Sequence, residues 1–211
     1  MSGKTPHTSR QTGPKTTTIN AKVISALAVV ASLFLQGCAP QSKPGYFREY
    51  ESAILEANSR SVQQSLEGQD HEKLFRNMEM LFSDLKHPDL EQRIRRTYAP
   101  SLYFNDTLRT YRTLEEVVDY LLETANRVTE TKAQFEEISS SNESYFIRWK
   151  MIMKFSVNGE TIETESIGVS QIKFDSSGKV IFHQDFWDNT EGFFRHLPLV
   201  GYVLDKTIQK L

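Results

Sequence analysis

The sequence predicts an α+β domain in which helices come first and cover one face of a curved antiparallel sheet. Two observations support this fold class. Between residues 70 and 127, apolar side chains recur at helical intervals. From residue 130 onward the apolar period changes to two, which is typical of strands with one buried face. Helices gathered before a run of strands indicate an α+β fold rather than an alternating α/β fold.

Apolar stripes and stop signals define the expected helices. The predicted helices cover residues 46–68 (a marginal one), 70–87, 89–98 and 113–127, with another after Pro198. Pro88 ends the second of these, because the residue before a proline is excluded from the helical region. The helix over residues 113–127 is the clearest, since Thr113 and Glu116 form a capping box ahead of its apolar stripe.

Alternating apolar residues and turn signals define the expected strands. The predicted strands cover residues 101–108, 130–139, 145–157, 160–174 and 179–188. Alternation is strongest over residues 145–157, which end at Asn158-Gly159. That dipeptide predicts a tight hairpin, because both central positions of a type I′ turn need a positive φ. The strand over residues 179–188 is expected to point Ile181, His183, Asp185 and Trp187 to one face.

The N-terminal 38 residues have the pattern of an export signal. Four basic residues and no acid precede an uncharged run over residues 23–35, and Leu35-Gln36-Gly37-Cys38 follows. The run has the length of a signal-peptide core and is short for a membrane span. This segment resembles the leader of bacterial lipoprotein precursors, which implies cleavage before Cys38 and attachment of lipid (palmitate) to it. The alternative is an uncleaved anchor helix with an incidental cysteine.

The residue after the cysteine bears on location. In the Gram-negative lipoproteins that this leader resembles, aspartate at that position favours retention at the inner membrane, whereas this chain has Ala39. The resemblance therefore implies a bacterial cell-envelope protein that is lipid-anchored to the outer membrane and faces the periplasm.

Composition limits the chemistry of the processed chain. The 211 residues include 25 basic and 27 acidic ones, and loss of residues 1–37 would leave 174 residues with a formal charge of −6. An acidic chain is a poor non-specific binder of nucleic acid. With its one cysteine lipidated, the chain has no thiol for a disulfide. The sequence shows no metal-ligand spacing and no phosphate-binding glycine loop, so no metal or cofactor is expected.

Two stretches of the domain carry a family resemblance. They are Tyr98 to Asp106, which opens the first strand, and Phe174 to Gly201, which spans the last strand and its exit. Residues 70–211 resemble the SnoaL-like, nuclear-transport-factor-2-like superfamily. The resemblance implies a cone-shaped, cystatin-like α+β barrel with a pocket at its wide end. Residues 1–37 are then the signal peptide, and residues 38–69 form a tether and the marginal helix.

Asp106 is the first candidate for chemistry. It is expected to share a face with Leu102 and Phe104, and apolar neighbours raise the pKa of a carboxyl and make it a better base. The resemblance to ketosteroid isomerases places a proton-transferring aspartate here. The same resemblance places a protonated acid at the position of Ser170, whose hydroxyl is a weaker donor. The alternative for Asp106 is a solvated residue at a strand end, or a cap of the turn before Thr107.

The second candidate group lies on the last predicted strand. His183 and Asp185 are two residues apart and share a face with Trp187, so they form an oriented base or a polar grip on a ligand. The resemblance to polyketide cyclases implies an acid near the end of this strand, which is Asp185 or Asp188. The alternative is a structural ion pair with Arg148 or Lys150.

Three functions follow from these residues. The first is a lipid-anchored envelope protein whose conical pocket binds a small apolar or lipid-like molecule. The second is an isomerase, cyclase or dehydratase of a carbonyl-containing substrate, with Asp106 or His183/Asp185 as base. The third is a homodimeric scaffold that associates through its open sheet face. The apolar tail after Phe193 is expected to close the mouth of the cone, to lie on the membrane, or to pack on the sheet.

Overall fold

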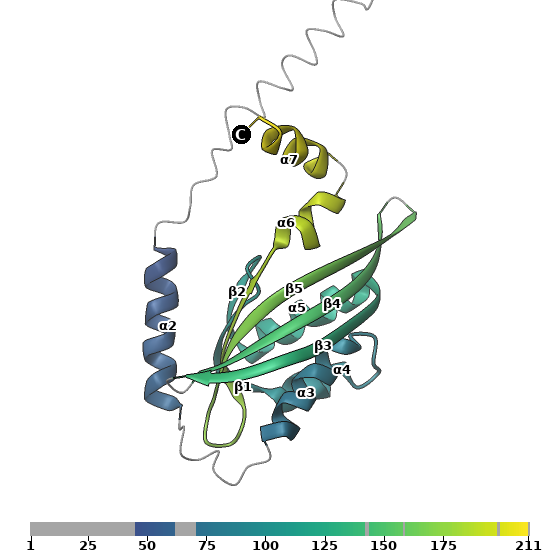
Figure 1. Ribbon diagram of the computed structural model, residues 1–211. Coiled ribbons are helices and arrows are strands. Elements are labelled where there is room, and N and C mark those ends of the chain that lie inside the picture. Colours follow the sequence, from purple (N-terminus) through teal and green to yellow (C-terminus); the bar gives the residue numbers. More distant parts are fainter. Residues whose placement is uncertain (1–44, 62–70, 142–143, 158, 198, 211) are drawn as a thin grey trace, which may run out of the picture. The chain divides into compact units, whose positions relative to one another are not determined.

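The computed structural model describes residues 45–61, 71–141, 144–157, 159–197 and 199–210 (Figure 1). Residues Phe47–Leu211 form one compact unit. Its helices are α2 (Tyr46–Arg60), α3 (His71–Ser83), α4 (Leu90–Thr97), α5 (Leu114–Arg127), α6 (Asn189–Gly192) and α7 (Val200–Ile208), with a 3-10 turn, η2 (Phe194–His196). Its strands are β1 (Tyr98–Asn105), β2 (Thr110–Thr113), β3 (Val128–Ser141), β4 (Ser144–Val157), β5 (Glu160–Phe174) and β6 (Val180–Trp187). The predicted α+β class is confirmed.

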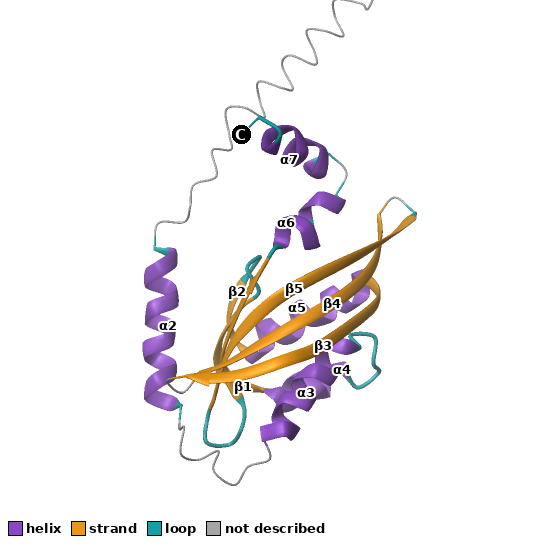
Figure 2. Ribbon diagram, viewed as in Figure 1, coloured by secondary structure: helices purple, strands orange, loops and turns teal. Residues whose placement is uncertain are grey.

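The strands form one curved six-stranded sheet in the order β2-β1-β6-β5-β4-β3 (Figure 2). Strands β3 to β6 form the predicted antiparallel meander, while β1 pairs with β6 in parallel. Strand β6 therefore lies in the middle of the sheet, between β1 and β5. The β4–β5 hairpin closes at Val157 opposite Glu160, and Gly159 has the positive φ of 85° that the turn requires.

One face of the sheet packs against α3, α4 and α5. The apolar stripes of these helices supply Met78, Leu81, Ile94, Val117 and Leu121, each no more than 3% exposed. They pack with inward side chains of four strands: Phe104, Ile147, Ile172 and Val180. The predicted capping box of Thr113 and Glu116 is present at the start of α5. Removal of this apolar surface from water is the main stabilising term of the unit.

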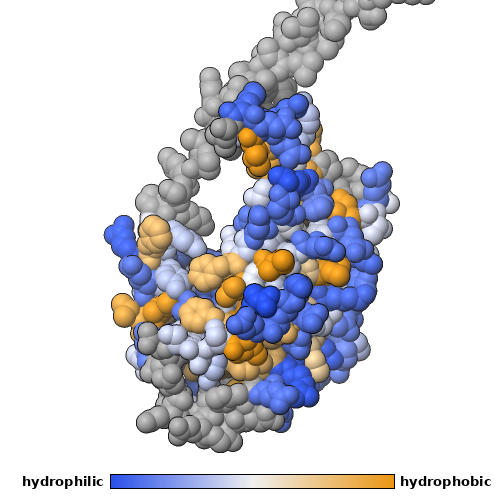
Figure 3. All heavy atoms as spheres, in the orientation of Figure 1, coloured by the Kyte–Doolittle hydropathy of each residue, from blue (hydrophilic) through white to orange (hydrophobic). Residues whose placement is uncertain are grey.

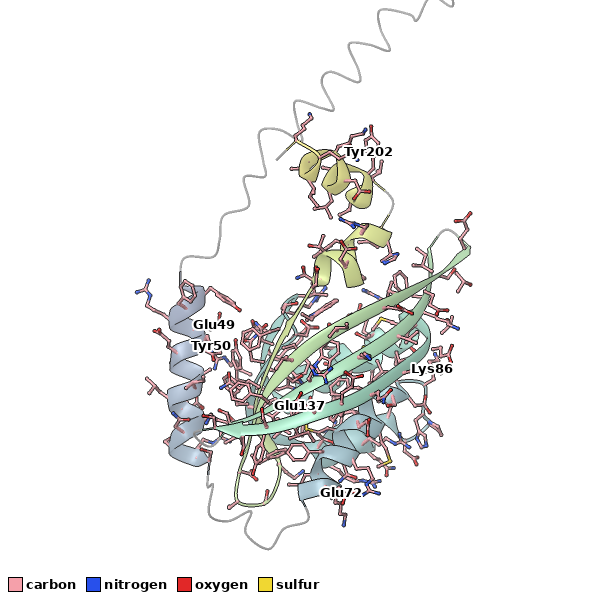
Figure 4. All side chains as sticks on the ribbon, viewed as in Figure 1. Glu49, Tyr50, Glu72, Lys86, Glu137 and Tyr202 are labelled. Atoms are coloured by element: carbon pink, nitrogen blue, oxygen red, sulfur yellow. The ribbon has the colours of Figure 1, made fainter. Side chains whose placement is uncertain are left out.

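Helix α2 packs on the opposite face of the sheet, over β1 and β6. Ala53 and Ala57 are almost fully buried against Tyr103, Ile181 and Phe182. Their small side chains let the helix backbone approach the sheet closely. Polar contacts help set its position: Tyr50 Oη donates to Gln171 Oε1 over 2.7 Å, Glu49 pairs with Arg112 at 3.5 Å, and Arg60 Nη2 donates to the backbone oxygen of Ser101 over 2.8 Å. Both Glu49 and Tyr50 lie on the side of the helix that faces the sheet (Figure 4).

The same sheet face is polar where it lies beyond α2. Glu136 pairs with Arg148 and, at 2.6 Å, with Lys150 across the β3–β4 ladder. Lys154 links Glu130 to Glu163 at 3.0 and 3.1 Å. Hydrophilic residues accordingly dominate much of the surface seen in Figure 3. These pairs hold register at the surface and contribute little free energy each.

Several details differ from the sequence prediction. Strand β1 begins at Tyr98, whereas a strand was predicted from residue 101, and β2, α6 and η2 were not predicted. The expected placement of Ile181 on the face of His183 is wrong. A register shift in the β5–β6 ladder, near Phe174, adds one residue there, so Val180 joins the core and Ile181 packs below α2.

No helix among the described residues has both the length and the apolar character needed to cross a bilayer. Cys38 and the predicted leader lie outside the described residues.

Candidate functional site

A cavity of about 720 Å³ opens between the helix-covered face of the sheet, helix α5 and the segment that follows β6. Most of its lining is apolar or aromatic, including Phe104, Phe135, Trp149, Met151, Met153, Phe155, Trp187, Phe193, Phe194 and Leu197. The alternation predicted for β4 is confirmed, because its odd-numbered residues from 149 to 155 line the cavity. The volume is in the range of pockets that hold small organic molecules.

His183 and Asp185 lie together in the wall of this cavity, on β6. His183 Nε2 is 2.8 Å from Asp185 Oδ1, and its Nδ1 is 2.7 Å from Tyr98 Oη. Burial, and secondarily the charge of Asp185, raise the pKa of Tyr98 well above 10, so its hydroxyl keeps its proton. That hydroxyl and Nδ1 share one buried hydrogen bond. The imidazole thus bridges the Tyr98 hydroxyl and the Asp185 carboxylate, and it donates from Nε2 to the carboxylate.

Ser170 and Trp149 support the same carboxylate from β5 and β4. The ladder puts Ser170 directly opposite Asp185, and Ser170 Oγ donates to Asp185 Oδ1 over 2.5 Å. Trp149 Nε1 donates in turn to Ser170 Oγ over 2.9 Å. The indole reaches this point because it crosses Gly168, where a Cβ would lie 2.3 Å from Trp149 Cζ2. Ser170 therefore donates its only hydroxyl hydrogen to Asp185, and this hydrogen is not available to a ligand.

Asp106 lies in the cavity wall just beyond β1. Its Oδ1 accepts from the backbone amides of Leu108 and Arg109, and its Oδ2 accepts from the hydroxyl of Tyr120 on α5. Burial raises the pKa of the Asp106 carboxyl, and the charge of Asp185 adds to the rise. Burial and Asp106 likewise raise the pKa of Tyr120. Asp106 thus lines the cavity and also caps a turn, which were alternatives in the sequence.

Trp187 lies in the cavity wall, whereas Asp188 lies outside it at the start of α6. Trp187 lines the cavity and donates from Nε1 to the backbone oxygen of Asp106 over 2.8 Å, which ties the end of β6 to the end of β1. Asp188 caps α6 by accepting from the amides of Thr190 and Glu191, and it is exposed. The structure therefore groups Asp106, Ser170, His183, Asp185 and Trp187, and leaves Asp188 apart from them. Arg148 and Lys150 pair with Glu136 on the other face, so they do not contact Asp185.

Around the two carboxyl groups, the side-chain hydrogens are already committed. Donation to a protein acceptor occupies Trp149, Ser170, His183, Tyr120 and Trp187, and the Tyr98 hydroxyl is bonded to His183. Asp185 Oδ2 makes no hydrogen bond to any described residue, and the Asp185 side chain is 15% exposed. This part of the cavity therefore offers hydrogen-bond acceptors to a ligand, whereas the donor groups named here are already bonded to protein atoms.

Residues farther from the carboxyl groups complete the lining. Arg127 and Glu123 pair with each other on α5, and Arg109 is exposed. Phe193, Phe194 and Leu197 follow β6 and line the cavity, as one of the predictions for the tail expected. Helix α7 contacts η2 and leaves Tyr202 66% exposed.

Sequence reasoning missed three members of the polar group: Tyr98, Tyr120 and Trp149. Each makes its contact across the sheet or from α5, so no short motif carries it. The available signal was a tyrosine in α5 next to the apolar residues Val117 and Leu121. Among the described residues, no three His, Cys, Asp or Glu side chains are placed to hold a metal ion.

Comparison with known proteins places the fold but not the family. No family model matches the chain, and no curated protein matches it. A putative SnoaL-like polyketide cyclase from Shewanella denitrificans OS-217 matches with 14% identity and a TM-score of 0.50, over 66% of this chain and 97% of that one. The unit therefore has the SnoaL-like, nuclear-transport-factor-2-like fold, as the sequence resemblance implied.

Two further solved structures are similar. A putative SnoaL-like polyketide cyclase from Shewanella putrefaciens CN-32 has 18% identity and a TM-score of 0.48, over 56% of this chain and 92% of that one. An NTF2-like protein of unknown function from Exiguobacterium sp. 255-15 has 12% identity and a TM-score of 0.48, over 55% and 98%. Because this fold hosts unrelated activities, function must be argued from the residues of the cavity.

Proposed function

We propose that the cavity binds a small, mostly apolar molecule and that the protein is held at a bacterial membrane, the outer membrane by its sequence pattern, through lipid on Cys38. The observation that carries the first part is the cavity itself. A volume of about 720 Å³ with a largely apolar lining is costly to leave filled with water. The second part rests on the leader, which lies outside the described residues.

Native mass spectrometry of the protein released from membranes tests the binding. We expect a co-purified small molecule. Ala133→Trp fills the cavity and should lower its occupancy at least about tenfold, because an overfilled site excludes a ligand. Gln134→Trp is the matched control, since Gln134 is the exposed neighbour on the same strand and does not line the cavity. Equal occupancy in the two variants would contradict the proposal.

A second candidate is acid–base catalysis on a carbonyl-containing substrate. Asp185 favours it, because this carboxylate has one free oxygen and is oriented by His183 and Ser170. Such a reaction also needs a donor for the developing oxyanion. Ser170 cannot donate a hydrogen bond to an oxyanion without losing the one that it donates to Asp185. The geometry therefore supports binding better than isomerisation.

Proton exchange separates these two functions without knowledge of the substrate. Benzylacetone carries exchangeable hydrogens beside a carbonyl. If Asp185 acts as a base, the protein should accelerate hydrogen–deuterium exchange at those carbons, and Asp185→Asn should abolish the acceleration. A binding protein leaves the exchange rate at its value in buffer.

A further inference from the structure

We propose that the ligand carries an ammonium group, which hydrogen-bonds to Asp185 from inside the cavity. This inference rests on the proposed binding function and specifies the chemical class of its ligand: an apolar amine rather than a carbonyl compound or an acid. Three features of the cavity lead to it.

The first feature is the hydrogen-bond inventory around Asp185. Its Oδ1 already accepts from Ser170 and His183, whereas Oδ2 has no partner among the described residues. The hydrogens of the neighbouring hydroxyl, indole and imidazole groups are donated to protein atoms. Ser166, four residues from Ser170 on the same strand, lies about 13 Å farther along. A ligand group that reaches Asp185 must therefore bring its own hydrogen.

The second feature is the pair of carboxyl groups, Asp106 and Asp185, in the cavity wall. Asp106 and Asp185 are close enough to influence each other, and the described residues include no lysine or arginine that pairs with either one. Arg127 is already paired with Glu123, and Arg109, the other arginine of the lining, is exposed and hydrogen-bonds to Tyr111. His183 contacts the Asp185 carboxylate through Nε2 and the Tyr98 hydroxyl through Nδ1, so both of its ring nitrogens are already bonded within the protein. A positive charge in the cavity would balance these carboxylates, and the apolar surroundings would strengthen the attraction.

The third feature is the aromatic lining next to this charge. Trp149 is hydrogen-bonded to Ser170, and Trp187 is hydrogen-bonded to the backbone of Asp106, so both indoles lie beside the carboxyl groups. Phe104 packs against His183 with ring centroids 4.9 Å apart. Aromatic faces attract cations and also bury hydrocarbon. A carbonyl or carboxylate oxygen would instead meet carboxylate lone pairs with no hydrogen between them.

Four probes with one hydrocarbon and different polar ends test the proposal: phenylbutylamine, phenylbutanol, benzylacetone and phenylbutyrate. The only two tryptophans of the chain, Trp149 and Trp187, line the cavity, so their fluorescence reports its occupancy in the full-length protein. We expect the amine to bind most tightly, by about tenfold or more over the ketone, because its hydrogen bond is charge-assisted. The alcohol should fall between them, and the acid should bind most weakly.

Asp185→Asn provides a sharper test because it exchanges the free acceptor for an amide donor. The variant should lose the preference for the amine and bind benzylacetone more tightly than the wild type does. Asp119→Asn is the matched control for general electrostatic attraction, since Asp119 is an exposed carboxylate on α5 that does not line the cavity. This control should change the affinity for the amine less than about twofold.

The outcomes distinguish this inference from the proposed function. Binding of all four probes with equal affinity, or tightest binding of the ketone or the acid, would overturn the ammonium proposal and leave the binding function intact. Tightest binding of the alcohol would also overturn it, because a neutral donor would then suffice. If Asp185→Asn keeps the preference for the amine, Asp185 is not the partner of the ammonium group, and the proposal is overturned. Failure of all four to bind would overturn both proposals.

Discussion

Tyr98 and Asp106 stand at the two ends of β1, and each links that strand to another part of the cavity wall. Tyr98 is fully buried and orients His183, which orients Asp185. Asp106 receives Tyr120 from α5. A small number of buried hydrogen bonds therefore sets which polar atoms face the cavity. Buried networks of this kind are sensitive to the loss of a single atom.

Tyr98→Phe removes one hydroxyl from that network. The Nδ1 atom of His183, a residue that is 2% exposed, would then lack its hydrogen-bond partner. We expect the free energy of unfolding in urea to fall by about 1–3 kcal/mol. Tyr202→Phe removes a hydroxyl from an exposed tyrosine and should change stability by less than about 0.5 kcal/mol. A similar small change in both variants would mean that the Tyr98–His183 hydrogen bond is dispensable.

Asp106→Asn probes the raised pKa of that carboxyl. Because the folded pKa lies above the ordinary value of 3.8, the native state binds the proton more tightly than the unfolded state. The contribution of Asp106 to stability therefore decreases as the pH rises from 3.8 through the raised pKa. The variant lacks this titration. Its free energy of unfolding in urea, relative to that of the wild type, should therefore increase as the pH rises over that interval. Asp119→Asn removes an exposed carboxyl from α5 and should follow the wild-type curve instead.

Part of this site could be predicted from the sequence. Period-two alternation predicted that His183, Asp185 and Trp187 share a face, and Asp106 was identified from its place after Phe104. The partners of these residues depend on strand register and on the approach of α5. Register decides that Ser170 lies opposite Asp185, and no local pattern encodes that pairing.

At the scale of elements, the helices and long strands were predictable because each has a buried face with a clear period. Strand β2 has four residues, and α6 and η2 are single turns, so none of them spans enough residues to show a period. The displaced Ile181 has a related cause. An extra residue in a ladder breaks the alternation where it is inserted, so Ile181 leaves the face that His183, Asp185 and Trp187 share, and the insertion is visible only once the strands are paired.

Helix α2 gives a test at this scale. Ala57→Glu places a carboxylate between the helix and β1/β6, where Ala57 is 3% exposed. It should lower the free energy of unfolding by about 2 kcal/mol, or release α2 if that costs less. Limited proteolysis should then cut within residues 46–60. Leu55→Glu is the control on the same helix, because Leu55 is 68% exposed, and it should behave as the wild type.

At the scale of the whole molecule, the predicted lipid on Cys38 makes a separate test. Cys38→Ser should abolish acylation and leave an unprocessed precursor or released protein, as seen by mass spectrometry of membrane and soluble fractions. Normal cleavage with unchanged membrane retention would contradict the lipoprotein prediction. The third prediction, a homodimer through the open sheet face, has its own measurement in sedimentation velocity. Helix α2 and the ion pairs of β3 and β4 occupy much of that face.

The central position of β6 has a consequence for how the molecule comes to be folded. Strand β1 supplies Tyr98, and β6 supplies His183 and Asp185, yet 74 residues separate the end of one strand from the start of the other. Closing so long a loop costs chain entropy before the strand contacts repay it, so this pairing is expected to be slow. During synthesis, β2 with β1 and β3 with β4 and β5 can form as two separate parts. Only the arrival of β6 joins them, and the ability to hold a ligand is acquired with that late step.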